Sequence, residues 1–329
     1  MNVAVVGAGV CGLTCSAELV DRGIHVTLFE QGESIGEHAC SWFAGGMLAP
    51  WCERESADPQ VVTMGQMAAS WWASKTQTLN QNGSLVLSPR RDLAELRQFA
   101  RKTSNYQWLQ GDAIGDLEAD LGGRFEQALF FESESHLSPR EALFDLADQI
   151  RASGSEINFV SPVDPAALAE SDRFKWVIDC RGFEAADSIS DLRGVKGEML
   201  IIRSDEIALT RPVRLLHPRM PMYMVPRSDG CFMLGATMIE NEDRDRITAR
   251  SMLELLSAAY ALHPAFGEAE IVEIGVDVRP ALPNNLPAVF KDGRLIRANG
   301  LFRHGFLLSP AVAQEVADIV ISEEIRTVA

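Results

Sequence analysis

The chain has 329 residues, of which 47% are hydrophobic and 23% charged, a composition typical of folded globular proteins and not of disordered or fibrous ones. Its 30 Lys and Arg residues against 46 Asp and Glu give a formal net charge of −16 at pH 7. So acidic a protein repels phosphate backbones and anionic lipid, which argues against a nucleic-acid or membrane partner. The length allows two domains, or one large unit that carries an insertion.

No run of about 18 apolar residues is apparent, so we expect no transmembrane span. The chain enters a strand at once, without the basic segment of a targeting peptide, and this predicts a cytoplasmic location. The six cysteines and six histidines show none of the paired spacings typical of metal ligands. We therefore expect reduced thiols and no metal site.

The N-terminal segment predicts a strand, a helix and a second strand. Residues 2–6 are β-formers that end at Gly7, and apolar residues then recur at helical spacing over 10–21. Residues 25–29 resume as a strand. This order is typical of a βαβ unit.

Further α/β elements are expected in the middle and at the end of the chain. A helix is predicted over 138–154, because it opens with an N-cap serine, a proline and a capping-box glutamate. Short strands are predicted at 157–160 and 176–180. After a segment from 295 to 308, the Ser-Pro pair is expected to open a last helix over 309–322.

Other segments have the pattern of an antiparallel sheet. Residues 223–227 and 231–235 predict a hairpin joined by Ser-Asp-Gly, and residues 271–279 alternate apolar and polar side chains as a half-buried strand does.

These elements predict an α/β fold in two parts. A Rossmann-type dinucleotide-binding domain is expected from residues 1–80, 138–195 and 275–329. A second, antiparallel-sheet-rich (α+β) substrate domain is expected from residues 81–137 and 196–274.

A glycine-rich loop follows the first predicted strand. It runs Gly-Ala-Gly-Val-Cys-Gly over residues 7–12, which is the pattern G-x-G-x-x-G, and it opens the predicted helix. Gly7 suits the tight turn, Gly9 lets a pyrophosphate approach the backbone, and Gly12 lets helix and strand pack closely. Glu30 ends the second strand, where a carboxylate accepts hydrogen bonds from ribose hydroxyls. The features together predict dinucleotide binding, and the absence of a second fingerprint leaves an NAD enzyme or a flavoprotein with one dinucleotide.

From residue 41 onward the chain resembles the glycine oxidase/D-amino-acid oxidase family of flavoenzymes. The segment SWFAGGMLAP at 41–50 matches a small-residue loop that passes along the flavin in this family. The family's glycine oxidases of thiamine biosynthesis share, in the same order, YMVPR at 223–227, GATM at 235–238, VRPA at 278–281 and NGLFRHGFLLSP at 299–310. DCRG at 179–182 and LRGVKGE at 192–198 resemble the proteobacterial branch. Phe302 stands where the family has tyrosine, and residues 217–222 are unusually rich in Pro and Met, which leaves the substrate scope open.

The resemblance implies an FAD-dependent oxidase that deaminates glycine or another small primary or secondary amino acid to the imino acid. Molecular oxygen would accept the electrons to give hydrogen peroxide, and the imino acid would supply thiazole formation for thiamine. The alternatives are a D-amino-acid or sarcosine oxidase, a flavin dehydrogenase that uses a carrier other than oxygen, and a non-catalytic FAD-binding scaffold. The oligomeric state is left open, a homo-oligomer included.

Three residues are candidates for the catalytic site. Arg279 lies on the polar face of an alternating strand, where its fork suits a carboxylate, and the alternative is an ion pair with Asp277. The Tyr223 hydroxyl would donate to the same carboxylate, or else face water as an amphipathic sheet residue. The resemblance implies that Arg303 is a second cation beside the substrate or the flavin. The alternative is a loop arginine that bonds local carbonyls.

The remaining candidates follow from the same motifs. Met47 and Met238 are expected to wall the substrate pocket, unless they are ordinary core residues. His304 is expected to contact flavin or backbone and not to act as a base. No acid–base side chain is required, and the N–H groups of the helix that opens at residue 309 are expected to face the flavin carbonyl. The expected cofactor-binding residues are Gly7, Gly9, Val10, Cys11, Gly12, Glu30, Gln31, Ser41, Gly45, Gly46, Met47, Val163, Cys180, Gly182, Arg303, His304, Gly305, Phe306 and Leu307.

Overall fold

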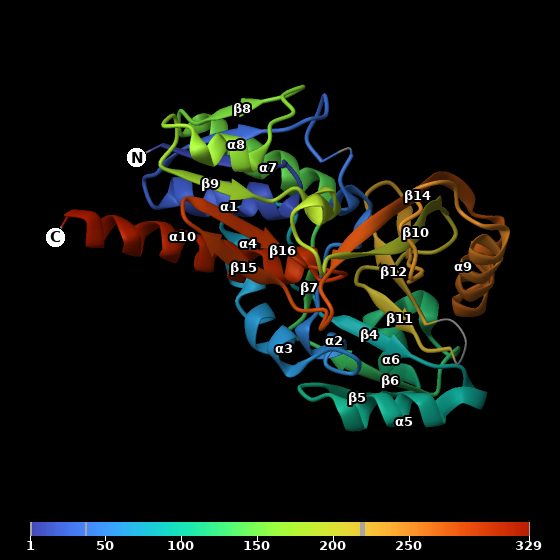
Figure 1. Ribbon diagram of the computed structural model, residues 1–329. Helices are drawn as coiled ribbons and strands as arrows, with labels where there is room; N and C mark the ends of the chain where they lie inside the picture. The colour runs from blue at the N-terminus through green and yellow to red at the C-terminus, as the bar shows by residue number, and fades with distance from the viewer. Residues whose placement is uncertain (1, 37, 218–220, 329) are drawn as a thin grey trace.

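The computed structural model describes residues 2–36, 38–217 and 221–328, and most of its strands belong to two large sheets. Figure 1 shows them in different parts of the molecule, the N-terminal strands with β9 and β16 on one side and the strands from β4 to β6 and from β10 to β14 on the other.

The first sheet has six strands and is parallel except at one edge. Its order is β15–β16–β9–β1–β2–β8, and β15 alone runs antiparallel to its neighbour. The strands are β1 (Asn2–Val6), β2 (His25–Phe29), β8 (Glu156–Asn158), β9 (Trp176–Asp179), β15 (Ala288–Asp292) and β16 (Leu295–Asn299).

Helices cover both faces of this sheet. Val3 and Val5 of β1 belong to the same buried cluster as residues of α1 (Val10–Asp21), α7 (Pro139–Ala152) and α10 (Gly305–Val328). Ala4 and Val6 pack with Phe174 on the opposite face, beside α8 (Pro165–Glu170). A strand buried on both faces is a continuous apolar run, which explains the sequence of β1.

The second sheet has eight strands in the order β14–β10–β13–β12–β11–β4–β6–β5, and all its neighbours are antiparallel except β11 and β4. The strands are β4 (Ser84–Leu87), β5 (Gln107–Gln110), β6 (Gln127–Phe131), β10 (Arg193–Arg203), β11 (Val213–Leu215), β12 (Met222–Pro226), β13 (Cys231–Gly235) and β14 (Glu270–Ala281). Leu85 and Leu87 pack in a cluster with α6 (Asp112–Leu117) and α9 (Ala249–Leu262), while Val86 packs with α5 (Leu93–Lys102).

Short elements connect the sheets. They are β3 (Met47–Leu48), which pairs with β7 (Ser135–His136), the helices α2 (Pro50–Glu53), α3 (Pro59–Gly65) and α4 (Ala68–Ala73), and the 3₁₀ helices η1 (Cys40–Phe43), η2 (Arg90–Asp92), η3 (Ala119–Leu121), η4 (Gly182–Asp187) and η5 (Pro264–Glu268).

The predicted α/β fold with a second, largely antiparallel sheet is confirmed. The elements predicted at 2–6, 10–21 and 25–29 coincide with β1, α1 and β2, whereas the strand expected at 157–160 is β8, which begins one residue earlier and ends at Asn158. Both β10 and β14 cross a predicted domain boundary, and the division of the chain at the named residues stays a prediction.

The last helix begins at Gly305, so the prediction that it opens at Ser309 and Pro310 is wrong. Pro310 lies inside the helix, where it lacks the amide that would bond the carbonyl of Phe306. The indole Nε1 of Trp72 donates to that carbonyl instead, at 2.8 Å. The helix accommodates the proline because another element replaces the missing hydrogen bond.

The alternation predicted for 271–279 is wrong for the first half of β14. Its apolar side chains are exposed there, Val272 to 51% and Ile274 to 47%, whereas the acidic Asp277 is buried. The strand lies at the edge of its sheet, and its pairing with β10 shifts register between Ile201 and Ile202. Such an irregularity changes the face to which the side chains point.

Residues Gly305–Glu323 of α10 are long and apolar enough to cross a membrane by composition. More than half of this segment is buried inside the protein, as in the core helix of a folded domain. The helix is therefore weak support for a membrane span.

Candidate active site

The main cavity has a volume of about 330 Å³ and extends from the glycine-rich loop to the eight-stranded sheet. It brings together most of the residues selected from the sequence. Those that line it are Gly7, Gly9, Val10, Cys11, Glu30, Gln31, Ser41, Gly45, Val163, Cys180, Gly182, Tyr223, Arg279, Arg303, Gly305 and Phe306.

The three loop glycines have different structural environments. Gly7 has a φ of +101°, a backbone conformation that side chains disfavour. A Cβ on Gly12 would lie 1.8 Å from the carbonyl oxygen of Gly7, so helix and strand could not pack as they do. A Cβ on Gly9 would meet no protein atom closer than 3.4 Å. Packing within the chain therefore explains Gly7 and Gly12, while the room at Gly9 is available to a ligand.

Glu30 and Ser41 shape the walls beside this loop. The two carboxylate oxygens of Glu30 accept hydrogen bonds from the backbone amides of Ala8, at 2.7 Å, and Gly32, at 2.8 Å. The Ser41 hydroxyl accepts one from the amide of Val10 at 3.3 Å, in the first turn of α1. The carboxylate is thus fixed at the end of β2, beside the N-terminus of the helix.

Tyr223 and Arg279 face the far end of the main cavity from two strands of the eight-stranded sheet. The Tyr223 ring packs over Gly45, where a Cβ would lie 3.0 Å from it, and burial raises the pKa of its hydroxyl. The Arg279 guanidinium lies over Gly197, where a Cβ would be 2.3 Å away, and its Nη1 donates to the carbonyl of Thr237 at 3.0 Å. The two side chains therefore border the same cavity.

Arg279 has no acidic partner within 4.0 Å among the described residues. Asp277, the partner that its sequence position suggests, lies 3.3 Å from Arg244 Nε and accepts the amide of Val278. The Tyr223 hydroxyl likewise makes no hydrogen bond with any part of the chain that the structure describes. Both groups keep donors available for an anionic ligand in the main cavity.

Arg303 is engaged by a buried carboxylate that the sequence analysis did not select. Glu53 Oε2 lies 2.7 Å from Arg303 Nη2, and Glu53 Oε1 accepts a hydrogen bond from Arg214 at 2.5 Å. Burial alone would raise the pKa of Glu53, but the two guanidinium groups hold it well below its usual range. Arg303 is thus paired with Glu53. The Glu53 carboxylate lies between Arg303 and Arg214, two arginines that are distant in the sequence.

A smaller cavity of about 50 Å³ lies next to the main one. Gly46, Met47, His304 and Leu307 line it, together with Glu53 and Tyr223. Burial lowers the pKa of His304 to about 4, although Glu53 acts in the opposite direction. A neutral imidazole is therefore expected there at pH 7.

Two of the selected residues lie outside both cavities. Gly12 serves the packing of α1, and Met238 is 53% exposed with its sulfur 3.5 Å from Arg303 Nη1. Of the Pro- and Met-rich stretch at 217–222, residues 218–220 lie outside the described residues.

Arg227 fixes the small-residue loop and also escaped the sequence analysis. Its Nη2 donates to the carbonyl oxygens of Gly45, at 2.9 Å, and Ala44, at 3.3 Å. Burial lowers its pKa to about 10, and within the described residues it forms no ion pair. The YMVPR motif contains this arginine, but nothing in the sequence indicates which carbonyls it meets.

The comparisons with known proteins agree with this geometry. Residues 2–319 match the DAO family of FAD dependent oxidoreductases. The chain belongs to this family. The oxidoreductase is 50% identical over 326 residues to the putative thiamine biosynthesis oxidoreductase ThiO of Rhizobium etli. This match covers 98% of each chain. It is 28% identical to the glycine oxidase of Pseudomonas aeruginosa, over 98% of this chain and 95% of the relative. The crystal structure of glycine oxidase from Geobacillus kaustophilus matches with a TM-score of 0.81 at 25% identity, over 97% of this chain and 94% of that chain.

The residues of this oxidoreductase fit FAD, so the cofactor expected from the motifs is confirmed and the NAD alternative is excluded. Space beside Gly9 at the N-terminus of α1 suits a pyrophosphate, because the amides of a first helical turn have no partner within the helix. Glu30 lies at the end of β2, where a ribose is expected. The main cavity then continues past Gly45 to Tyr223, which leaves room for the flavin end of the dinucleotide.

Proposed function

We propose that this oxidoreductase is an amino-acid oxidase of the glycine oxidase type, which converts a small amino acid and oxygen to the imino acid and hydrogen peroxide. The observation that carries the proposal is the pair Arg279 and Tyr223, which line the same cavity as the phosphate loop and, apart from the bond of Arg279 to Thr237, keep donors without a partner among the described residues. The names of the relatives, glycine oxidase and thiamine biosynthesis oxidoreductase, support it. A role of the imino acid in thiazole formation is part of the proposal.

Substrate binding follows from the chemistry of the clamp. The planar guanidinium of Arg279 suits a carboxylate with two parallel hydrogen bonds, and the hydroxyl of Tyr223 is able to donate a third. The carbonyl of Thr237 accepts a hydrogen bond from the guanidinium and fixes its position. Gly197 leaves the space that the guanidinium occupies, because it has no side chain. Fixing the carboxylate fixes the neighbouring carbon, which is the position that an oxidation of the amine requires.

The FAD of this family supplies the oxidative chemistry, acceptance of a hydride and transfer of the electrons to oxygen. The chain contributes orientation and electrostatics. The N-terminus of α10 brings the amides of Gly305 and Phe306 to the main cavity, where their partial positive charge stabilises negative charge. Arg227 and the Arg303–Glu53 pair hold the loops on either side.

We further propose that the part built on the six-stranded sheet binds the cofactor and the part built on the eight-stranded sheet holds the substrate. Residues 1–80, 138–195 and 275–329 would form the first, and 81–137 and 196–274 the second. A cytoplasmic location fits the described cysteines, which are free.

The test is the yield of peroxide from glycine, sarcosine and D-alanine, measured side by side with an Arg279→Ala variant as the matched control. We expect the highest kcat/KM with glycine and one peroxide for each amino acid consumed. Peroxide from sarcosine or D-alanine alone would overturn the choice of substrate. Reduction of a dye without peroxide would identify a dehydrogenase, and no reaction with any of the three would contradict the whole proposal.

A further inference from the structure

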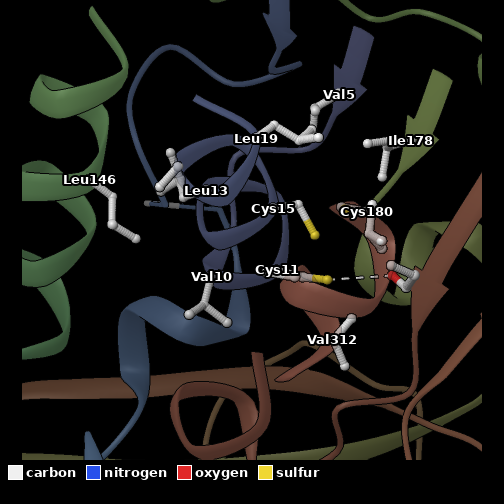
Figure 2. Close-up of a cluster of buried hydrophobic side chains, with 14 of the residues drawn as sticks. Val5, Val10, Cys11, Leu13, Cys15, Leu19, Leu146, Ile178, Cys180 and Val312 are labelled. Carbon is white, nitrogen blue, oxygen red and sulfur yellow. Dashed lines mark hydrogen bonds between the residues drawn. The ribbon is translucent and has the colours of Figure 1, made fainter. Parts of the chain in front are cut away.

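Three cysteines that are scattered along the sequence meet beneath the phosphate loop. The sulfur atoms of Cys11, Cys15 and Cys180 all lie within 4.8 Å of one another. Figure 2 shows Cys11 and Cys15 projecting from the same side of α1 towards Cys180. The spacing rules of metal-binding motifs do not detect such a cluster, because one member comes from a different element.

The fold brings these thiols together through features that the nucleotide fold already requires. Cys11 and Cys15 are one helical turn apart on α1, and Cys180 follows β9 directly. Gly12 permits the close packing of α1 on the loop, since a Cβ there would lie 1.8 Å from the carbonyl oxygen of Gly7. The cluster, defined here as the three-thiol cluster, is therefore part of a rigid junction between helix and strand.

The surroundings of the three-thiol cluster are mostly apolar, apart from the carbonyl oxygen of Ala298, to which the Cys11 thiol donates at 3.5 Å. Val5, Ile178 and Val312 belong to the same buried core (Figure 2). Cys15 is fully buried, whereas Cys11 and Cys180 also line the main cavity. The three-thiol cluster therefore lies beside the wall of the main cavity, with a buried apolar core on its other side.

A cation at the three-thiol cluster would displace the thiol protons, as metal binding to thiols does.

We propose that the three-thiol cluster binds one soft, closed-shell cation through three thiolates, with Cu(I) as the preferred ion. Thiolates select soft ions such as Cu(I) over hard ones. Three sulfurs that each lie about 2.3 Å from a central ion are about 4.0 Å apart, so the observed separation needs only a small contraction. No fourth His, Cys, Asp or Glu joins the group among the described residues, which disfavours the four-coordinate site that structural zinc requires.

Loading the site would oppose FAD binding. Three thiolates around Cu(I) carry a net charge of −2, and two of the three cysteines line the cavity beside the pyrophosphate position. The loaded three-thiol cluster and the pyrophosphate of FAD would then be neighbouring anions, which repel one another. Affinity for Cu(I) is therefore expected to be higher in FAD-depleted than in FAD-saturated protein, and equal affinities in the two forms would show that the ion lies elsewhere.

The experiment is an anaerobic titration of the full-length, reduced protein with Cu(I) against a chromogenic Cu(I) chelator. We expect one equivalent bound by the wild type, and sulfur-only coordination with three neighbours in X-ray absorption. Cys15→Ala should weaken binding by at least about a hundredfold, beyond the range typical of losing an outer-shell partner. Cys231→Ala is the matched control, because Cys231 lies outside the cluster, and it should bind as the wild type does.

Two results would overturn the proposal. One is a wild-type protein that takes no Cu(I) from the chelator, or no more than Cys15→Ala does. The other is a shell of two sulfurs. Cys11→Ser serves as a second variant if Cys15→Ala fails to fold, and the retained FAD content of each variant checks its structure.

Discussion

Arg279 and Tyr223 face the main cavity from different strands, so the contributions to substrate binding that we propose for them are separable. Removing one partner of a buried charged pair costs roughly 3–5 kcal/mol. Arg279→Ala should therefore lower kcat/KM for glycine by at least about a hundredfold, allowing for solvent in the cavity, at about tenfold for each 1.36 kcal/mol. Arg279→Lys should recover little, since a point charge does not reproduce the fork. Tyr223→Phe should cost less, on the order of 1 kcal/mol for one hydrogen bond.

Steady-state kinetics on these three variants, each with its FAD content measured, distinguishes a clamp from a structural role. Near-normal KM and kcat in Arg279→Ala would mean that the guanidinium serves only its bond to Thr237. The substrate then need not carry a carboxylate.

Gly9 and Gly12 provide a second pair of matched substitutions. A valine at position 9 fills the space left for the pyrophosphate, so Gly9→Val should lose FAD while the FAD-free chain unfolds at an unchanged temperature. Gly12→Ala should instead destabilise the FAD-free chain itself, because its Cβ would meet the Gly7 carbonyl at 1.8 Å. Full flavin occupancy in Gly9→Val, read from visible absorbance, would refute the loop assignment.

Sequence reasoning selected cavity-lining residues that belong to motifs and missed residues whose partners are distant in the sequence. The glycine loop, Tyr223 and Arg279 each lie in a local sequence motif that indicates their chemistry, and all three line the main cavity. Glu53 lies 161 residues from its partner Arg214, and no local pattern announces such a pair. The three-thiol cluster escaped for the same reason.

At the scale of elements, the N-terminus of α10 depends on one hydrogen bond from α4. Trp72→Phe would leave the Phe306 carbonyl without its donor, at a cost of about 1–3 kcal/mol. Pro310→Ala supplies a backbone amide to the same carbonyl, so the double variant should recover most of the loss. Denaturant unfolding of the two single variants and the double variant measures the coupling, and strictly additive effects would show that the two residues act independently.

The same hydrogen bond explains why the sequence misplaced the start of α10. A Ser-Pro pair is a sound signal for a first turn, because proline is usually excluded further along a helix. The signal failed at Pro310 because a tryptophan from another element satisfies the orphaned carbonyl. In β14 the alternation failed similarly, since only the sheet position and register of a strand decide which of its faces is buried.

For the whole molecule, buried neutral histidines predict a loss of stability in acid. Burial lowers the pKa of His136 to about 4, while the ordinary value is 6.5. Between these values the unfolded chain binds a proton that the folded chain refuses, so the free energy of unfolding falls as the pH falls from 6.5 to 4. His304 acts in the same direction, and Glu134, whose pKa burial raises to about 6, acts in the opposite one.

His136→Gln should therefore flatten the pH dependence of unfolding by up to about one proton in that window. His25→Gln is the control, because His25 is exposed. Denaturant midpoints at a series of pH values provide the measurement. Identical slopes in His136→Gln and wild type would contradict the assignment of a neutral, buried imidazole.

The fold of the whole molecule was largely predictable because its signals are local. The βαβ start and the hairpin each occupy a few residues. How the two sheets share the main cavity was not predictable, since Gly45 meets Tyr223 and Arg227 only through the tertiary structure.

The most direct test of the proposed chemistry is the absorbance of the FAD-loaded protein after anaerobic mixing with glycine. We predict that the yellow flavin band bleaches with a rate that saturates in glycine, and that Arg279→Ala needs a glycine concentration at least about a hundredfold higher for the same rate. A flavin band that stays unchanged with glycine, sarcosine and D-alanine alike would contradict the assignment of this protein as an amino-acid oxidase.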